Sequence, residues 1–597
     1  MFVPHMTRKP ALLLSFLVSL LVAAAAFAQS VNGYSMRDAV GEKAYAAAPR
    51  LAQLVPVEPA VTLDTVVRAM PEKVVEIEQW NASGHVPWRN GVRRPLVDPV
   101  KVQLGGALIA SKNGPAPLGR GIAAATARGV AWSGSVKIAG ASRLRLHLEH
   151  VNLPADAVLW VYGGSDSTAF GRELIDPQGG LWTPAAWGDT IHLEVEVPAG
   201  AAASFDVDEV LELLDETLVA RSLKPAPNDT PSCLEDVMCV TSTPLPLANV
   251  KRAIAHIEFV VPEGGAACSG GLLADTKSSG IPYFLTANHC ISTQTEASSL
   301  QAYFDWTYSS CVSTTIPPLS SVPKESGSTL LATKDVNTGS DFTLLRLDSV
   351  PANRYFLGWN ADRSAIPAST ELYRISHPAP AGFGPQPQQY STSVITTSGP
   401  RCSLDTNNFI FSVNDVGGTY GGSSGSPVML ANAQVVGQLF GGCAAAGHDP
   451  QAGCDAAVLN VDGAFASSYP FLQSFLNPSA AGCTPTSTVA CLVNNRFSVR
   501  IDWKTSGGQT GAGQAIKYTD ASALFWFFGP DNIEVLLKVL NACSLSNTYW
   551  VFSAATTDVE YTIYVTDTQK GTTKTYFHAG GSAAPAITDT SAFATCP

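Results

Sequence analysis

The chain has 597 residues, of which only 14% are charged, and its formal net charge is −12. Nucleic-acid binding needs a basic surface, so an acidic chain with few charges is expected to have no nucleic-acid partner. No internal repeat is evident, and the length predicts three or four domains at roughly 150 residues each.

The first 28 residues have the pattern of a secretory signal peptide. Arg8 and Lys9 precede an apolar run over residues 11–25, and Ala26-Phe27-Ala28 forms a small-x-small cleavage site. This run is shorter than the roughly 20 residues of a membrane-spanning helix, and no later stretch approaches that length. We therefore expect a secreted protein with no membrane partner after signal cleavage.

All twelve cysteines lie in the C-terminal two thirds of the chain. An even number in an exported protein predicts complete pairing. Zinc is disfavoured because there is no Cys-x2-Cys pair and the ten histidines lack ligand spacing. We expect no metal and no other cofactor. The expected disulfide residues are Cys233, Cys239, Cys268, Cys290, Cys311, Cys402, Cys443, Cys454, Cys483, Cys491, Cys543 and Cys596.

Residues 29–227 are expected to form a β-rich N-terminal domain. Residues 143–149 and 190–197 alternate between apolar and polar side chains, and turn residues separate such runs. This pattern favours a β-sandwich without a catalytic site. Residues 223–231 then form a polar, proline-rich stretch beside Arg221, which is typical of an exposed linker. We expect proteolytic activation here, by the enzyme itself or by another protease; the alternative is a linker that stays intact.

Residues 228–478 contain the residues that carry chemistry. Short apolar runs recur between turns, which predicts β-barrels. Three motifs follow one another: His289 in Thr-Ala-Asn-His-Cys, Asp341 in Ser-Asp-Phe-Thr, and Ser424 in Gly-Ser-Ser-Gly-Ser-Pro. This is the His, Asp, Ser order of chymotrypsin-like proteases, so the fold class is expected to be mainly β with a double barrel.

These three residues have distinct predicted roles in acyl transfer. Ser424 would attack the peptide carbonyl after His289 removes its proton, and Asp341 would orient the imidazole. The backbone N–H groups of Gly422 and Ser424 would form the oxyanion hole that binds the tetrahedral intermediate.

The same region resembles the bacterial secreted lysyl endopeptidases, which are chymotrypsin-class proteases. The resemblance runs from residues 232–239 through the His289 motif, residues 326–329, the Asp341 motif, Gly358-Trp359 and His377-Pro378 to residues 422–427 and 437–439. It implies an endopeptidase acting on proteins or peptides. It also implies that residues 29–227 are a pro-region that inhibits the enzyme or assists its folding. We expect a monomer.

The resemblance leaves the substrate pocket open between two residues. Lysyl endopeptidases bind the lysine ammonium with a pocket aspartate, and an ungapped count from Ser424 places Asp455 there. Alignment of the following Asp-Gly-Ala-Phe strand places Asn460 there instead. Phe440 replaces a histidine of the family at the pocket rim. Leu439 and Gly441 are expected to pair with the peptide backbone.

Two further expectations follow from the likeness to known proteases. Trypsin-like zymogens have an aspartate before the nucleophile that pairs with a new N-terminus, whereas Ser423 here has no charge. Activation is therefore expected to work by removal of the pro-region. The resemblance also implies Cys239–Cys311 and Cys268–Cys290 bridges, and it pairs Cys233 with Cys443 or Cys454, leaving the other for Cys402.

Residues 483–597 are expected to form a small C-terminal β-sandwich with two disulfides. Residues 524–528, Leu-Phe-Trp-Phe-Phe, are interpreted as a core or edge strand rather than an aromatic binding surface. The predicted function is a secreted serine endopeptidase made as a precursor, with a Lys or Arg preference if Asp455 lines the pocket. The alternatives are a secreted adhesive or polymer-binding protein with an inactive protease domain, and a secreted esterase.

Overall fold

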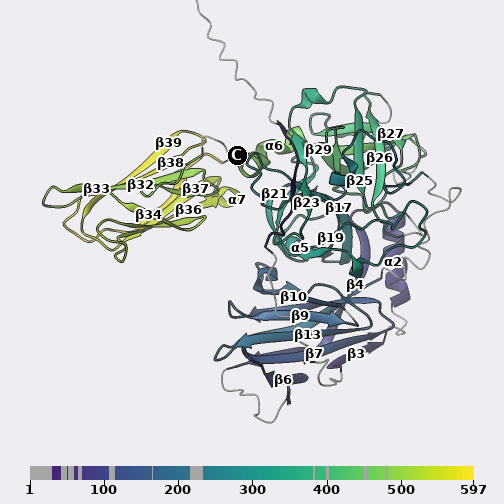
Figure 1. Cartoon of the computed structure of the whole chain (residues 1–597), viewed down its shortest axis with the longest axis horizontal. Coiled ribbons are helices and arrows are strands. Elements are labelled where there is room, and N and C mark those ends of the chain that lie inside the picture. Colours follow the sequence, from purple (N-terminus) through teal and green to yellow (C-terminus); the bar gives the residue numbers. More distant parts are fainter. Residues whose placement is uncertain are drawn as a thin grey trace, which may run out of the picture.

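The computed structural model describes residues 30–41, 50–51, 59–64, 70–105, 115–164, 166–214, 233–380, 384–398, 402–448, 453–477 and 482–596. The expected signal peptide and the expected activation segment at residues 221–231 lie outside this set. We call residues 30–214 the N-terminal region, 233–477 the central region and 482–596 the C-terminal region. Figure 1 shows the N-terminal region in blue below the central region, with the C-terminal region to one side. No helix among the described residues is both long and apolar enough to cross a bilayer.

The N-terminal region consists of two sheets that pack face to face. One sheet has the order β10-β9-β13-β7-β6-β5 with β3 beside β7, and the other contains β11-β8-β14-β4. Apolar residues from both sheets, such as Leu146 on β8 and Ile191 on β13, form one buried cluster. The elements are β3 (Val61–Asp64), α2 (Met70–Ala82), β4 (Trp88–Leu104), β5 (Ala116–Leu118), β6 (Gly121–Ala125), β7 (Gly129–Ala139), β8 (Arg143–Asn152), β9 (Val158–Gly163), β10 (Asp166–Phe170), η1 (Arg172–Leu174), β11 (Leu181–Trp182), β12 (Ala186–Trp187), β13 (Thr190–Pro198) and β14 (Ala203–Leu213).

The first half of the central region forms one β-barrel. Strands β20 and β21 are separated only by Gly327, so the ladder of β21, β22, β18, β17, β16, β19 and β20 returns to its start. Phe259, Phe284 and Phe304 are among its buried core residues. The elements are β15 (Glu235–Asp236), α4 (Leu247–Val250), β16 (Ile254–Val261), β17 (Gly264–Leu273), β18 (Tyr283–Ala287), α5 (Gln294–Ser298), β19 (Gln301–Phe304), η2 (Leu319–Ser321), β20 (Lys324–Ser326), β21 (Ser328–Lys334) and β22 (Phe342–Leu347).

The second half forms another barrel, which closes because β29 pairs with both β28 and β30. The ring is β29-β28-β25-β26-β27-β30. A cluster that includes Phe342 from the first barrel and Met429 from the second lies between the two barrels. The chain therefore has the double β-barrel of the chymotrypsin-like fold. The elements are β23 (Arg354–Phe356), β24 (Gly358–Asn360), η3 (Arg363–Ala365), β25 (Glu371–Ser376), β26 (Gln389–Ile395), β27 (Phe409–Val416), β28 (Pro427–Met429), β29 (Gln434–Ala444), β30 (Val458–Ala464) and α6 (Phe465–Leu476).

The C-terminal region also consists of two sheets around one core. The orders are β31-β32-β38-β39 with β33 beside β32, and β34-β35-β36-β37-β40. Within β35, Ala523 and Phe525 are buried, whereas Phe528 beyond its end is 53% exposed. The elements are β31 (Ala490–Leu492), β32 (Phe497–Lys504), β33 (Thr510–Ala512), β34 (Gln514–Thr519), β35 (Ser522–Trp526), β36 (Val535–Ala542), α7 (Cys543–Ser546), β37 (Thr548–Ala555), β38 (Glu560–Asp567), β39 (Thr572–His578) and β40 (Ile587–Phe593).

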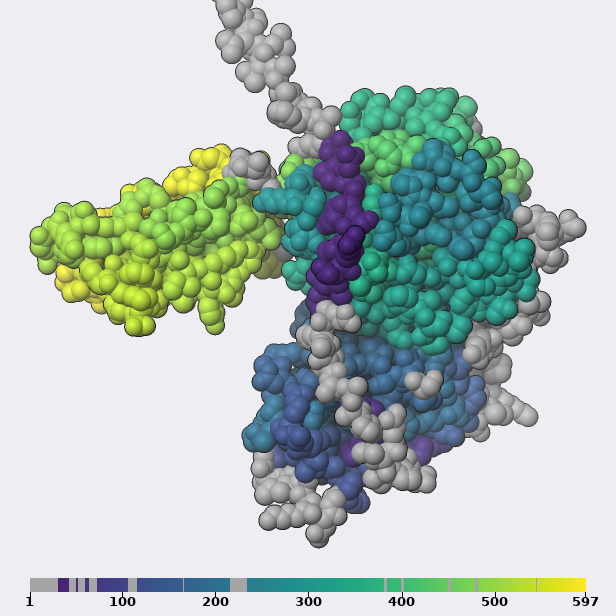
Figure 2. All heavy atoms as spheres, in the orientation of Figure 1, coloured from purple at the N-terminus to yellow at the C-terminus, as the bar shows by residue number. Residues whose placement is uncertain are grey.

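The N-terminal end of the chain lies on the central region and not with the N-terminal sheets. We call residues 30–41 the N-terminal strap. Its strands β1 (Ser30–Val31) and β2 (Tyr34–Met36) pair with β24 and β23, respectively. Val31 packs against the core of the first barrel and against the apolar cluster between the two barrels. Figure 2 shows the strap as a narrow purple strip across the surface of the central region. The sequence did not predict this position, since a short strand on another domain leaves no periodic pattern.

A second connection joins the two regions through a continuous sheet. Strand β4 of the N-terminal region pairs with β14 on one edge and with β17 of the first barrel on the other. The pairing brings Gly91 against the start of β17, where a Cβ on Gly264 would lie 2.2 Å from the carbonyl oxygen of Gly91. Such a close approach requires glycine.

Candidate active site

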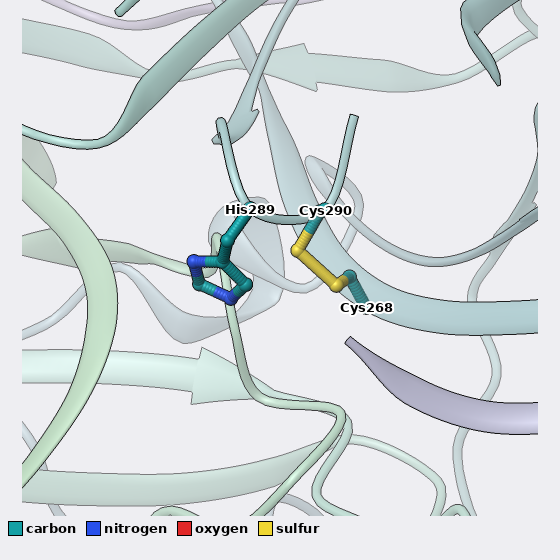
Figure 3. Close-up of side chains that lie close together, drawn as sticks. All are labelled: Cys268, His289 and Cys290. Carbon is teal, nitrogen blue, oxygen red and sulfur yellow. A yellow bond between two sulfur atoms is a disulfide. The ribbon is translucent and has the colours of Figure 1, made fainter. Parts of the chain in front are cut away.

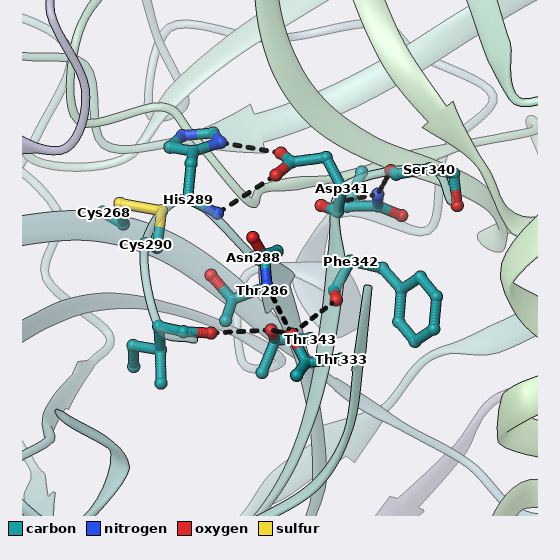
Figure 4. A network of polar contacts seen from close by, with 12 residues as sticks. Cys268, Thr286, Asn288, His289, Cys290, Thr333, Ser340, Asp341, Phe342 and Thr343 are labelled. Atoms are coloured by element: carbon teal, nitrogen blue, oxygen red, sulfur yellow. Dashed lines mark hydrogen bonds and ion pairs between the residues drawn. A yellow bond between two sulfur atoms is a disulfide. The ribbon is translucent and has the colours of Figure 1, made fainter. Parts of the chain in front are cut away.

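His289 and Asp341 meet at the open end of the first barrel. His289 follows β18 and Asp341 precedes β22, and these strands pair directly with Ala287 opposite Phe342. The Nδ1 atom of His289 lies 2.7 Å from Oδ2 of Asp341, and the backbone N–H of His289 donates to Oδ1 at 3.0 Å (Figure 4). The carboxylate thus fixes the imidazole, with its Nδ1 side toward Asp341.

Asp341 is held in an unusual backbone conformation. Its φ is +54°, in the left-handed region that non-glycine residues seldom adopt. The backbone N–H of Asn288 donates to its carbonyl at 3.1 Å, and the buried Gln438 side chain donates to the carbonyl of Ser340 at 2.7 Å. These bonds hold the strained residue in place. The sequence resemblance includes Gln438 but gives it no role, because it is separated from Asp341 by almost a hundred residues.

A disulfide between Cys268 and Cys290 fastens the segment that carries His289 to strand β17 (Figure 3). The two sulfurs and the imidazole lie close enough together to resemble a metal-ligand group. The sulfurs are bonded to each other, however, and so are not thiolate ligands. The bridge is a structural tie beside the imidazole.

Ser424 lies in the tight loop between β27 and β28. It is 4% exposed, and its carbonyl accepts a 2.8 Å hydrogen bond from the N–H of Ser269 on β17. On the other side of the loop, the N–H of Gly425 donates to the carbonyl of Leu439 on β29 at 2.8 Å. The loop that carries Ser424 is therefore held between the first barrel and β29.

Gly425 brings this loop against the strand that carries His289. Its φ is +79°, and a Cβ there would lie 2.6 Å from the carbonyl oxygen of Ser269 and 2.7 Å from the backbone N of Ala287. The Nε2 atom of His289 is buried and has no hydrogen-bond partner among the described residues. This nitrogen is thus available to accept a proton.

Gly422 also has a positive φ, +86°. A Cβ there would lie 2.7 Å from the carbonyl oxygen of His377, so only glycine fits. The hydroxyl of Ser269 donates to the carbonyl of Gly422 at 2.8 Å and accepts from the N–H of His377 at 3.0 Å. These contacts tie the loop to a completely buried segment, in which burial lowers the pKa of His377 well below its usual value.

A buried ion pair lies beneath the same loop. Arg374 on β25 pairs with Asp462 on β30 at 2.6 Å and donates to the carbonyl of Ser426 at 2.9 Å. Burial raises the pKa of Asp462, while the guanidinium of Arg374 opposes this shift. Ser423 is fully buried, and its hydroxyl accepts from that of Ser376 at 3.0 Å. The sequence analysis did not single out Arg374 or Asp462, whose pairing depends on the closed second barrel.

Asn460 and Asp455 have very different surroundings. Asn460 on β30 is 2% exposed; its carboxamide accepts from the hydroxyl of Thr419 at 2.8 Å and donates to Asn414 at 2.6 Å. Thr419 lies five positions before Ser424. Asp455 lies on a surface loop, pairs with His448 at 2.5 Å and accepts from the N–H of Ala457 at 2.8 Å. The hydrogen bond from the backbone N–H of Ala457 lowers the pKa of Asp455, and the hydrogen bond from the His448 side chain lowers it further.

The other residues expected to contact substrate lie along β29. The N–H of Leu439 already donates to the carbonyl of Ser426 at 3.0 Å, so it has no proton left for a peptide. The ring of Phe440 lies edge-on to His289, with centroids 5.9 Å apart. A Cβ on Gly441 would meet no atom within 4 Å, which leaves the strand accessible from that side.

The cysteines of the structure form six disulfides. Two of them, Cys239–Cys311 and Cys268–Cys290, are the pairs that the sequence resemblance implies, and Cys233 pairs with Cys454 rather than Cys443. The remaining pairs are Cys402–Cys443, Cys483–Cys491 and Cys543–Cys596.

Comparison with known proteins gives family matches in the N-terminal region and in the central region. The family model "Lysyl endopeptidase, C-terminal domain" matches residues 227–456, and "Lysyl endopeptidase N-terminal domain" matches residues 125–207. A lysyl endopeptidase of Pseudomonas aeruginosa is 26% identical over 332 residues, which are 52% of this chain and 68% of the relative.

Solved structures similar to the chain include two proteases. HL collagenase is 14% identical, with a TM-score of 0.27, over 38% of this chain and 94% of its own. The thermostable serine protease AL20 from an extremophilic microorganism is 15% identical, with a TM-score of 0.25, over 38% of this chain and 99% of its own. The two family models and the curated relative therefore show that residues 125–207 and 227–456 are similar to lysyl endopeptidases, and they support a serine endopeptidase.

Proposed function

We propose that this chain is the precursor of a secreted endopeptidase in which Ser424 is the nucleophile, His289 the general base and Asp341 its orienting acid. The 2.7 Å contact between His289 and Asp341 carries the proposal. It is supported by the unpartnered Nε2 atom of His289 and by the packing of the Ser424 loop against the strand before His289.

The proposed reaction runs through an acyl-enzyme. As the Ser424 hydroxyl attacks the peptide carbonyl, its proton passes to Nε2 of His289, and the backbone N–H groups of Gly422 and Ser424 stabilise the oxyanion. His289 then returns the proton to the leaving amine. A water molecule, deprotonated by the same imidazole, hydrolyses the ester to regenerate Ser424.

We propose further that Asn460, and not Asp455, lies at the base of the pocket for the residue on the acyl side of the scissile bond. Asn460 is buried, and Thr419 connects it to the chain just before the nucleophile, whereas Asp455 is partly exposed and already paired with His448. A lysine ammonium buried without a countercharge is costly. An uncharged residue is therefore the proposed preference, in contrast to the Lys or Arg preference that Asp455 would give.

The N-terminal region is proposed to be a pro-region that is removed after export. Its strap and strand β4 both pair with the central region, so its release would uncover surface on both barrels. The uncharged Ser423 is bonded to Ser376 and offers no carboxylate for a new N-terminus. Activation by release of the pro-region is consistent with this environment.

Hydrolysis of a mixed peptide library, by the chain cut after the N-terminal region and diluted until that region dissociates, tests the proposed function. We expect Ser424→Ala and His289→Ala to lower kcat by about 10⁴-fold or more, because each removes a member of the triad. Ser423→Ala is the matched control, and it should retain activity within a factor of about ten, because it deletes only two neutral hydrogen bonds, from the hydroxyl of Ser376 and the N–H of Tyr420. Cleavage that survives in Ser424→Ala would refute the proposal.

A further inference from the structure

Trp88 of the N-terminal region lies beside the loop that carries Ser424. It is 5% exposed and packs with Ala267 on β17 and Ala379 in one apolar cluster. Its Cδ1 atom would lie 3.2 Å from a Cβ on Gly421, the residue before Gly422. An aromatic side chain from the N-terminal region thus reaches the edge of the proposed oxyanion hole.

The backbone around Trp88 forms part of the first barrel's sheet. Trp88 is the antiparallel partner of Ala267, and Arg89 that of Ala266. Main-chain pairing with an exposed strand edge is also the way in which extended peptides bind to proteins. Trp88 and Arg89 therefore occupy the place of a bound peptide on β17.

This place is on the leaving-group side of the nucleophile. The N–H of Gly425 donates a hydrogen bond to β29, and the carbonyl of Ser424 accepts one from Ser269 on β17. The Ser424 loop thus lies between these two strands. In the proposed function, Asn460 on β30, which pairs with β29, receives the acyl part of the substrate. A peptide that continues past Ser424 and His289 must then run along β17.

Contacts on both sides hold Trp88 in position. In helix α2, the indole N–H of Trp80 donates to the carbonyl of Pro87 at 2.9 Å, and Asn81 exchanges two hydrogen bonds with the backbone of Arg89. Deeper in the interface, Asn90 donates to the buried carboxylate of Glu258 on β16 at 3.0 Å. The Trp80 and Asn81 contacts lie within the N-terminal region and order the strand, which lowers the entropic cost of its binding to β17, whereas the Asn90 bond is made across the interface.

Resting on the proposed function, we propose that the space filled by Trp88 is a substrate subsite for an aromatic residue on the leaving-group side of the scissile bond. In the precursor, Trp88 occupies this subsite itself. The N-terminal region then blocks extended peptides, while a substrate with a small leaving group can still react. The pairing of Trp88 with Ala267, directly before Cys268 and its disulfide to the His289 segment, places the subsite one or two residues beyond the scissile bond.

The test uses the full chain from residue 29, in which a recognition sequence for a site-specific protease replaces residues 225–230. After cutting, the N-terminal region is held only by non-covalent contacts. Hydrolysis of a short ester with a small leaving group reports on Ser424 and normalises all rates. If Ser424-dependent ester hydrolysis is absent, the proposed function fails; if it is present, the subsite is tested separately.

Two comparisons decide the proposal. Trp88→Ala should raise the dissociation constant of the cut N-terminal region at least about thirtyfold, as for a buried aromatic anchor, whereas Trp88→Phe should change it by less than about fivefold. In dilute, dissociated wild-type enzyme, peptides with Trp or Phe at the first or second leaving-group position should be cleaved about tenfold faster than peptides with Ala there.

Equal cleavage of the aromatic and alanine peptides at both positions would overturn the subsite. An equal effect of Trp88→Ala and Trp88→Phe on dissociation would overturn the role of the aromatic ring. If Trp88→Ala does not fold, as judged by its thermal transition, the peptide series on the wild-type enzyme decides the question alone.

Discussion

The carboxylate of Asp341 contacts His289 twice: one oxygen lies beside the imidazole Nδ1, and the other accepts from the backbone N–H. Asp341→Asn keeps the size of the side chain but offers an N–H to Nδ1, which favours the wrong tautomer. We expect kcat to fall by about 10⁴-fold at neutral pH. Asp335→Asn is the matched control on a nearby exposed turn, and its kcat should stay within about twofold of the wild type. Equal kcat values for both variants would argue against the assignment of Asp341.

The pocket assignment also depends on single residues. Asn460→Asp would place a carboxylate between Thr419 and Asn414, and it should raise kcat/KM for Lys or Arg over neutral residues by at least about tenfold. Asp455→Asn should leave this ratio within about twofold, because an exposed ion pair contributes little. A cleavage profile of the three proteins measures both ratios. Loss of a basic preference in Asp455→Asn alone would assign the pocket to Asp455.

At the scale of elements, the loop between β27 and β28 is shaped by glycines that a side chain cannot replace. Gly425→Ala adds a Cβ against Ser269 and Ala287, whereas Gly447→Ala, also at positive φ, meets no atom within 4 Å. Gly447→Ala should therefore show only the backbone strain of about 1 kcal/mol. Gly425→Ala should lower kcat by at least about 10²-fold, since the loop must move. Similar activity losses in both variants would contradict this packing.

The N-terminal strap pairs with strands next to both barrels. Val31→Asp puts a charge against the apolar clusters there, and we expect it to lower the free energy of unfolding of the full chain by about 1–3 kcal/mol. Ser30→Asp, one residue earlier and exposed, is the control and should have little effect. Chemical denaturation of the full chain measures both changes. Identical stabilities would mean that the strap adds nothing to the fold.

At the scale of the whole molecule, one buried ion pair links the N-terminal and central regions. Arg143 on β8 and Glu258 on β16 are 2.6 Å apart, each with a 2% exposed side chain. Burial alone would raise the pKa of Glu258, but the Arg143 charge and the neighbouring His256 outweigh it and lower that pKa to about 2. The full chain thus keeps a charged carboxylate deep in the interface between the regions.

This ion pair makes the stability of the full chain dependent on pH. The pKa of Glu258 falls from 4.5 to about 2 on folding, so its contribution is complete above about pH 4.5 and is lost as the pH falls toward 2. The difference in thermal midpoint between the wild type and Glu258→Gln should therefore shrink over this range. Glu72→Gln, on the exposed side of α2, should track the wild type. A difference in thermal midpoint between the wild type and Glu258→Gln that stays constant over this pH range would contradict the lowered pKa of Glu258.

Much of the candidate active site could be proposed from the sequence because its residues lie in short local motifs. His289, Asp341 and Ser424 each lie in a distinctive string, and the glycines at 422 and 425 are needed for the turn itself. Local sequence does not decide whether Asp455 or Asn460 lies in the pocket, because their positions depend on the register of β30 against β27 and β29. The strap, Trp88 and the Arg143–Glu258 pair join residues over a hundred positions apart, and no periodic pattern records such contacts.

The most direct test of the central claim is the site of covalent modification by a fluorophosphonate, located by peptide mapping and mass spectrometry. We expect a single adduct on Ser424 in the wild-type chain, no adduct in Ser424→Ala, and labelling slowed by at least about 10²-fold in His289→Ala. An adduct on Ser423 or Ser426, or no adduct in the wild type, would contradict the account.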